Sequence, residues 1–204
     1  IKYFIHILKN YLQIYETLAY KVGLKQKVLF MKFISYSHND EDKFGILDND
    51  LITDLTGKIS GATSLKDLIL KKGISEAKKY ASANPGNLSV NDIEYLPLIP
   101  NPGKIICVGL NYSEHVKETN RTVEENPVIF HRFPESQTAH LQAIQRPIAS
   151  DNLDFEGEMA VIMGEAGKHI KPEDALKHIV GYSCYNESTI RDWQRHTRQF
   201  GMGK

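Results

Sequence analysis

The chain has 204 residues, of which 41% are hydrophobic and 25% are charged, a composition typical of soluble globular proteins. Basic and acidic residues both number 25, so the formal net charge is zero. This balance argues against a nucleic-acid-binding protein, because neutralising phosphates requires a basic excess. Cys107 and Cys184 are far apart in apolar surroundings, so we interpret them as free, buried thiols of a cytoplasmic protein.

Residues 1–30 differ in character from the rest of the chain. Apolar residues spaced three to four apart from Ile5 to Tyr15 are typical of an amphipathic helix. The segment has no run of 18 apolar residues, so it does not match a membrane-spanning helix. It also lacks a small-residue cleavage site after an apolar core, so it is a poor match to a signal peptide. Because a different pattern starts at Met31, we expect an upstream extension outside the core of the protein.

Residues 31–96 predict a small β-rich domain. Two runs, 31–38 and 44–55, have the composition of short strands, and an Asp-Asn-Asp turn interrupts the second. A short helix is expected at 64–73, with a serine as its N-cap and a glycine as its end. Residues 76–87 form a polar stretch that ends in a Pro-Gly turn. No catalytic side chains gather in this region.

A connector with Pro97, Pro100 and Pro102 comes next, and we place a domain boundary there, with residues 97–204 as the second domain. The next segment, KIICVGL (104–110), predicts a buried strand.

A helix is expected to begin after this strand at Asn111. On that helix His115 and Glu118 are three residues apart and share a face. A carboxylate beside an imidazole orients the ring and raises its basicity, as in a general base. A solvated pair on a surface helix would show the same spacing, so the residues alone leave both interpretations open.

The segment LDFEGEMAVIMG, residues 153–164, predicts a strand that ends at Gly164. Glu156 and Glu158 are two residues apart, so they share one face of an element that otherwise looks buried. Like charges repel at short range and desolvation adds to the cost, so something must compensate them.

A third carboxylate, Glu187, comes after the strand-like segment IVGYSCY (179–185), which residues 186–188 interrupt. Three carboxylates without a cluster of cysteine or histidine favour a hard divalent cation, namely Mg²⁺, Mn²⁺ or Ca²⁺. The alternative is that the Glu156–Glu158 pair lines a solvated edge strand and binds no metal.

Three segments occur together in an order and spacing that resembles the fumarylacetoacetate hydrolase family: KIICVGLNYSEH, LDFEGEMAVIMG and GYSCYNESTIRDWQ. The chain is most similar to the bacterial branch that carries FEGE, RDWQ and QF..GK, over about residues 31–204. The resemblance implies an α+β, β-rich fold with a small N-terminal domain before a mixed β-sandwich roll. Family members continue beyond the position of Lys204, so it also implies a truncated chain with an incomplete roll.

The resemblance assigns roles residue by residue. Glu156 and Glu158 match the metal ligands of the family, and Glu187 falls where the third ligand is normally an aspartate. His115 and Glu118 match the pair that activates water. The remaining polar positions match groups that bind substrate or stabilise its oxyanion: Arg132, Gln194 and Lys204.

Glu187 departs from the aspartate of the family, and the pair Arg191–Asp192 follows it in the sequence. Glu187 is one methylene longer than aspartate, about 1.5 Å of extra reach. Because Mg²⁺ tolerates little geometric error, we expect the site to shift toward Mn²⁺ or Ca²⁺. Arg191 and Asp192 are expected to be structural, because an adjacent pair of this kind commonly fixes a loop by hydrogen bonds.

The activity that the resemblance implies is hydrolysis of a C–C bond in a short oxo acid, such as an acylpyruvate or a fumarylacetoacetate-like compound, by a homodimer with Mg²⁺ or Mn²⁺. His115, oriented by Glu118, would take a proton from water, while Lys204 and Gln194 stabilise oxyanion charge. One alternative is an isomerase or decarboxylase of an oxo diacid at the same site. Another is a non-catalytic, truncated remnant. No nucleic-acid or membrane partner is expected.

Overall fold

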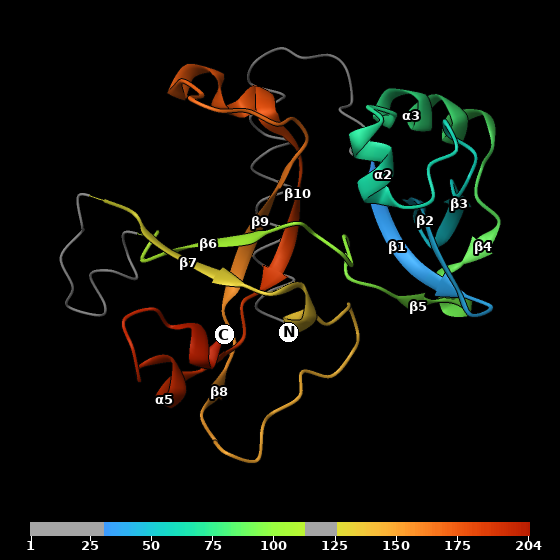
Figure 1. Cartoon of the computed structure of the whole chain (residues 1–204). Coiled ribbons are helices and arrows are strands. Elements are labelled where there is room, and N and C mark those ends of the chain that lie inside the picture. The colour runs from blue at the N-terminus through green and yellow to red at the C-terminus, as the bar shows by residue number, and fades with distance from the viewer. Residues whose placement is uncertain (1–30, 113–125) are drawn as a thin grey trace, which may run out of the picture. The chain divides into compact units, whose positions relative to one another are not determined.

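The computed structural model describes residues 31–112 and 126–204. The chain divides into two units, Ile1–Met31 and Lys32–Lys204, and the described residues lie almost entirely in the second. The α+β, β-rich fold class predicted from the sequence is confirmed (Figure 1).

Some expected features lie outside the described residues. They are the upstream extension of residues 1–30 and the helix that carries His115 and Glu118. Among the helices that the structure describes, none has the length and apolar character needed to cross a membrane.

Within the described residues, the first half of the second unit is an antiparallel sheet with strand order β4-β3-β2-β1-β5. Its strands are β1 (Lys32–His38), β2 (Glu41–Asp48), β3 (Leu51–Asp54), β4 (Leu88–Ser89) and β5 (Glu94–Tyr95). The predicted strands and the turn between β2 and β3 are confirmed. Asn49 in that turn has a φ of 52°, a left-handed conformation that asparagine tolerates because its short polar side chain can bond locally.

The core of this half is apolar. Tyr36, Phe44 and Ile52 come from three adjacent strands and are fully buried. Helices α2 (Leu65–Leu70) and α3 (Ile74–Ala83) add further buried apolar side chains. The predicted helix and its cap are confirmed in α2, where the Ser64 hydroxyl accepts from the Asp67 amide at 3.1 Å. Helix α3 occupies most of the stretch we interpreted as polar, because alanine, glutamate and lysine are strong helix formers.

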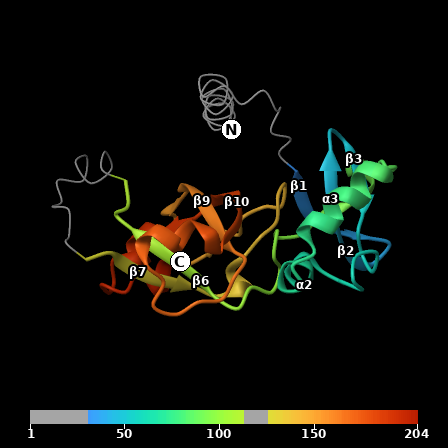
Figure 2. The same cartoon turned by 90° about the horizontal axis from the view of Figure 1, so that it is seen from above.

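The second half of the unit contains, among its described residues, three two-stranded antiparallel ribbons (Figures 1 and 2). They pair β6 (Ile105–Gly109) with β7 (Val128–Arg132), β9 (Gly157–Met163) with β10 (Ile179–Asn186), and β8 (Leu153–Asp154) with β11 (Thr189–Ile190). Among the described residues, the further short helices are η1 (Val90–Asp92) in the first half, then η2 (Pro134–Ser136), η3 (Pro172–His178), α5 (Arg191–Gln194) and η4 (Gly201–Gly203).

The ribbons correct three expectations. The strand predicted over residues 153–164 is two strands, interrupted at Phe155 and Glu156. It was also expected to be buried, yet Met159 and the alternate positions beyond it are exposed. The strand at 104–110 is confirmed, but Ile106 and Val108 on one face are exposed.

The expectation of two buried thiols is wrong for Cys184, which is exposed. It lies on the outward face of β10, where strand alternation puts it on the same side as Tyr182. Cys107 is half-buried in β6, and both cysteines are free as predicted. The division at residue 96 stays a prediction.

Candidate metal centre

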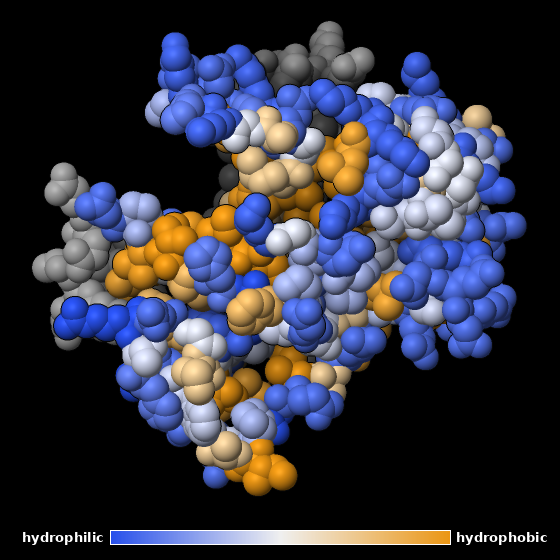
Figure 3. All heavy atoms as spheres, viewed as in Figure 1, coloured by the Kyte–Doolittle hydropathy of each residue, from blue (hydrophilic) through white to orange (hydrophobic). Residues whose placement is uncertain are grey.

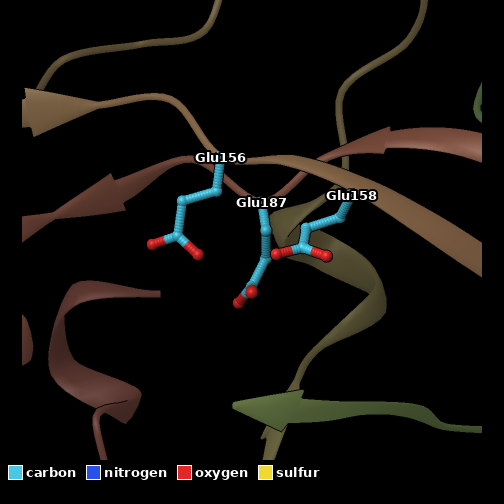
Figure 4. Close-up of side chains that lie close together, drawn as sticks. All are labelled: Glu156, Glu158 and Glu187. Atoms are coloured by element: carbon cyan, nitrogen blue, oxygen red, sulfur yellow. The ribbon is translucent and has the colours of Figure 1, made fainter. Parts of the chain in front are cut away.

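Three carboxylates from separate positions of the chain converge. Glu156 lies in the break between β8 and β9, Glu158 in β9, and Glu187 directly after β10 (Figure 4). One carboxylate oxygen from each residue lies within 4.8 Å of the others. The sequence spacing therefore predicts correctly that these side chains meet, while their role as ligands stays a prediction.

The register of β9 and β10 explains the convergence. Glu158 pairs with Tyr185 and Gly157 pairs with Asn186, so the next residues along, Glu156 and Glu187, face each other. The Glu187 amide donates to the Glu156 carbonyl at 2.8 Å and fixes this opposition. A second hydrogen bond holds the two segments together, because the side-chain oxygen of Asn186 accepts from the Glu156 amide at 3.1 Å.

Basic side chains compensate the carboxylates. The Lys204 Nζ lies 3.2 Å from Oε1 of Glu156 and 2.9 Å from Oε1 of Glu187. Arg132 reaches the same Glu187 oxygen at 3.4 Å. Arg191 donates to Oε1 of Glu156 at 2.5 Å. The repulsion is thus offset within the protein, by residues distant in the sequence.

Two carboxylates of the cluster have opposite electrostatic environments. Burial favours a higher pKa for Glu156, but Lys204, the Thr189 hydroxyl and Arg191 outweigh it, so the pKa of Glu156 is lowered. Burial raises the pKa of Glu158, and the charges of Glu187 and Glu156 raise it further despite a hydrogen bond from Tyr112. Neighbouring titratable groups whose pKa values move apart are a common property of catalytic sites.

Close packing of the last residues places Lys204. Gly203 is buried, and a Cβ built there would lie 2.5 Å from both the Gln194 amide nitrogen and the Ile190 carbonyl oxygen. Glycine is therefore required for η4 to pack against α5. The Lys204 side chain is 2% exposed, and its Nζ lies 4.9 Å from the centre of the Phe130 ring, a cation–π contact.

The residues predicted to bind substrate lie in or next to this network. Arg132 is buried and also donates to the Ser188 carbonyl at 3.1 Å, so the structure directs its guanidinium toward Glu187 and the adjacent backbone. Gln194 accepts from Arg191 at 3.3 Å. Contacts of these two residues with substrate stay predictions, as do the roles of the residues outside the described part of the chain.

Sequence reasoning missed part of the network. Arg191 does fix a loop, since it also donates to Asp154 at 2.8 Å, but the expectation of a purely structural role omitted its bond to Glu156. Asp192 accepts from the Ser150 hydroxyl at 2.7 Å, a hydrogen bond of the kind expected of a residue that fixes a loop. Thr189 was not singled out, although its side chain is fully buried between charged groups.

The donor set fits a hard divalent cation such as Mg²⁺ or Mn²⁺. All three convergent ligands are carboxylate oxygens, which such ions prefer. The contacts from basic residues to Glu187 go to its Oε1, whereas Lys204 lies near both carboxylate oxygens of Glu156, so Lys204 must move if Glu156 binds an ion. Burial and then the charge of Glu187 raise the pKa of Cys107 to about 11.

Comparisons with known proteins find related sequences. The family model for the fumarylacetoacetate (FAA) hydrolase C-terminal domain matches residues 104–204. The chain is 38% identical to a mitochondrial oxaloacetate tautomerase of Xenopus laevis over 136 residues, 66% of this chain and 43% of that protein. It is 35% identical to a human mitochondrial oxaloacetate tautomerase over 133 residues, 64% of this chain and 42% of that protein.

A solved structure also shares the fold. A fumarylacetoacetate hydrolase from Exiguobacterium antarcticum superposes with a TM-score of 0.72 at 29% identity, covering 86% of this chain and 62% of that one. The match spans less than half the length of the two curated tautomerases. Because these proteins come from animals and a bacterium, the assignment to a bacterial branch stays a prediction.

Proposed function

Residues 104–204 belong to the fumarylacetoacetate hydrolase family, and on this premise we propose that the protein is a divalent-metal-dependent enzyme acting on a short 2-oxo acid. The observation that carries the proposal is the convergence of Glu156, Glu158 and Glu187 beside the buried ammonium group of Lys204. Three carboxylates gathered in partly buried surroundings require positive charge close by, which basic side chains supply in this structure and a divalent cation would supply when bound.

The chemistry follows from the groups present. Glu156, Glu158 and Glu187 would hold the ion, which supplies Lewis-acid stabilisation of negative charge on the oxo oxygen of the substrate. Lys204 donates to the carboxylates in this structure, and it could stabilise the same developing charge if it turned from them to the substrate. Because Lys204 is almost fully buried, its interaction with an oxyanion would be little weakened by water.

Tautomerisation of an oxo diacid is the first candidate reaction. It moves one proton between the carbon beside the carbonyl and the carbonyl oxygen, and it breaks no C–C bond. The named relatives at 35–38% identity are oxaloacetate tautomerases, which favours this reaction over the others that a similar site could perform. Tautomerisation also requires the fewest catalytic groups, since one proton-transferring group and one stabilised oxyanion suffice.

Hydrolysis of a C–C bond in an acylpyruvate or a fumarylacetoacetate-like compound is the second candidate. It is favoured by the His115–Glu118 pair in the sequence, a spacing that suits activation of water. Decarboxylation of an oxo diacid is a third candidate reaction, and the assays described next would detect it.

The test is a set of assays on the purified chain with and without Mn²⁺. Enol-to-keto conversion of oxaloacetate is followed by ultraviolet absorbance, acylpyruvate cleavage by loss of the diketone band, and decarboxylation by released CO₂. We expect Mn²⁺-dependent tautomerisation above the spontaneous rate, which a Glu158→Gln variant should lose. Mn²⁺ binding without any turnover would support a structural metal in a non-catalytic protein. The absence of both Mn²⁺ binding and turnover would overturn the proposal.

We also propose a homodimer, as the family resemblance implies, and a cytoplasmic location, as the two free cysteines indicate. Light scattering on the purified chain tests the first point, with a monomer mass as the contradicting result. Fractionation of cells that express the protein tests the second.

A further inference from the structure

Thr189 occupies an unusual position for a hydroxyl. It lies in β11, opposite Asp154 of β8, so its side chain is directed to the stretch that leads into Glu156. Its side chain is fully buried, and its neighbours are charged groups of the metal centre. A buried hydroxyl without hydrogen bonds costs desolvation free energy, and a valine of the same shape would not carry that cost. The hydroxyl of Thr189 is therefore expected to be hydrogen-bonded.

The hydroxyl has three polar atoms around it. The Lys204 Nζ lies 2.8 Å away, Oε1 of Glu156 lies 2.9 Å away, and the Glu187 carbonyl oxygen lies 3.0 Å away. Lys204 can only donate, so Thr189 accepts from it. The single hydroxyl proton then has two possible acceptors, and the charged carboxylate of Glu156 is the stronger one.

These bonds form a directed chain from the ammonium of Lys204, through Thr189, to the carboxylate of Glu156. Each bond fixes the orientation of the next, and charge at both ends strengthens them. Lys204 and Glu156 also contact each other directly at 3.2 Å, so Thr189 closes a three-membered ring of contacts. Such a ring defines the position of the carboxylate more narrowly than an ion pair alone.

We propose that Thr189 is a positioning residue that holds Glu156 and Lys204 in the geometry required for cation binding. The inference rests on the proposed function, because it assumes that Glu156 is a ligand. Groups that orient metal ligands in this way commonly change metal affinity by about 10- to 100-fold when they are removed.

The experiment compares three variants of the chain by Mn²⁺ titration calorimetry. Thr189→Val removes the hydroxyl and keeps the shape, and it should weaken Mn²⁺ binding about 10- to 100-fold. Thr189→Ser keeps the hydroxyl and should restore affinity to nearly that of the unaltered chain. Thr53→Val is the matched control: Thr53 is also buried, but its hydroxyl donates to the Asn84 carbonyl at 3.1 Å in the small sheet, so its loss should leave affinity unchanged.

A crystal structure of Thr189→Val without metal supplies a second measurement that does not depend on binding. We expect the Glu156 carboxylate and the Lys204 ammonium to move apart from their positions here. Unmoved side chains, or equal affinity in the valine and serine variants, would overturn the inference. If the unaltered chain binds no Mn²⁺, the proposed function fails, and the positions of Glu156 and Lys204 in the valine variant still decide whether Thr189 positions them.

Discussion

The small sheet and the ribbon region bury opposite kinds of side chain. In the sheet of residues 32–95 the fully buried side chains are mainly apolar, as at Tyr36 and Ile52. In the ribbons the buried residues include Arg132, Glu187 and Thr189, while many large apolar side chains are exposed. Figure 3 shows part of that apolar surface in orange.

This difference implies that the stability of the first region and the chemistry of the second depend on different kinds of side chain. A core of close-packed apolar groups holds the first region together without specific partners. Charged groups in the second region are acceptable only because each has a partner at a defined distance. The first region should therefore respond to loss of volume, and the second to loss of one charge or one hydrogen bond.

Arg132→Met should give the largest effect. It keeps the volume but leaves Glu187 with only part of its compensation, which typically costs about 3–5 kcal/mol of unfolding free energy. Urea denaturation measures this. The control is Arg146→Met, whose ion pair with Asp151 is exposed, and less than about 1 kcal/mol is expected there. Similar losses in the two variants would contradict the distinction between buried and exposed pairs.

Ile52→Ala probes the other region. Ile52 is fully buried in β3, so truncation should cost about 2–5 kcal/mol and leave Mn²⁺ affinity unchanged. Leu51→Ala, one residue earlier on the exposed side of the strand, should cost much less. Chemical denaturation and calorimetry test the pair, and a change of Mn²⁺ affinity in Ile52→Ala would show that the regions are not independent.

Gly203→Ala should disturb the placement of Lys204. The new Cβ meets backbone atoms of Gln194 and Ile190, so η4 must shift, at about 1–3 kcal/mol of unfolding free energy. Gly201→Ala lies in the same short helix with nothing within 4 Å of its added Cβ. Thermal unfolding should therefore separate the two alanine variants, and equal melting temperatures would mean that the packing against α5 is loose.

Glu187→Asp should give the smallest effect, a change in ion preference. The longer side chain brings Oε1 to Lys204 and Arg132, and aspartate would withdraw it by about 1.5 Å. We expect the ratio of Mg²⁺ to Mn²⁺ affinity to rise in the aspartate variant, because Mg²⁺ demands stricter geometry. Competition titrations give the ratio, and an unchanged value would exclude Glu187 as a ligand or show that the backbone absorbs the extra methylene.

The sequence predicted local features well. Strands β1 to β3, the turn before β3 and the serine cap of α2 are all set by neighbouring residues, whereas the two-residue strands β4 and β5 were not predicted. Helix α3 was missed because its apolar residues are too few to show a helical period. The break before β9 was missed because Phe155 and Glu156 are both compatible with a strand.

The candidate site was predictable only in part. The spacing of Glu156 and Glu158 predicts a shared face, and the resemblance adds Glu187. The opposition of Glu156 and Glu187 depends on the register between β9 and β10, which the residues next to the two glutamates do not specify by themselves. Compensation by Lys204 and Arg132 joins residues far apart in the chain, so the sequence suggested only an ion as the partner of the carboxylates.

In the proposed function, Glu156, Glu158 and Glu187 together hold a divalent ion. The most direct measurement is anomalous diffraction from crystals of the chain soaked in MnCl₂. We predict one strong manganese peak within coordination distance of an oxygen from each carboxylate, with the Lys204 ammonium moved from its position between Glu156 and Glu187. A peak elsewhere, or carboxylates still bridged by Lys204 with no manganese between them, would contradict the claim.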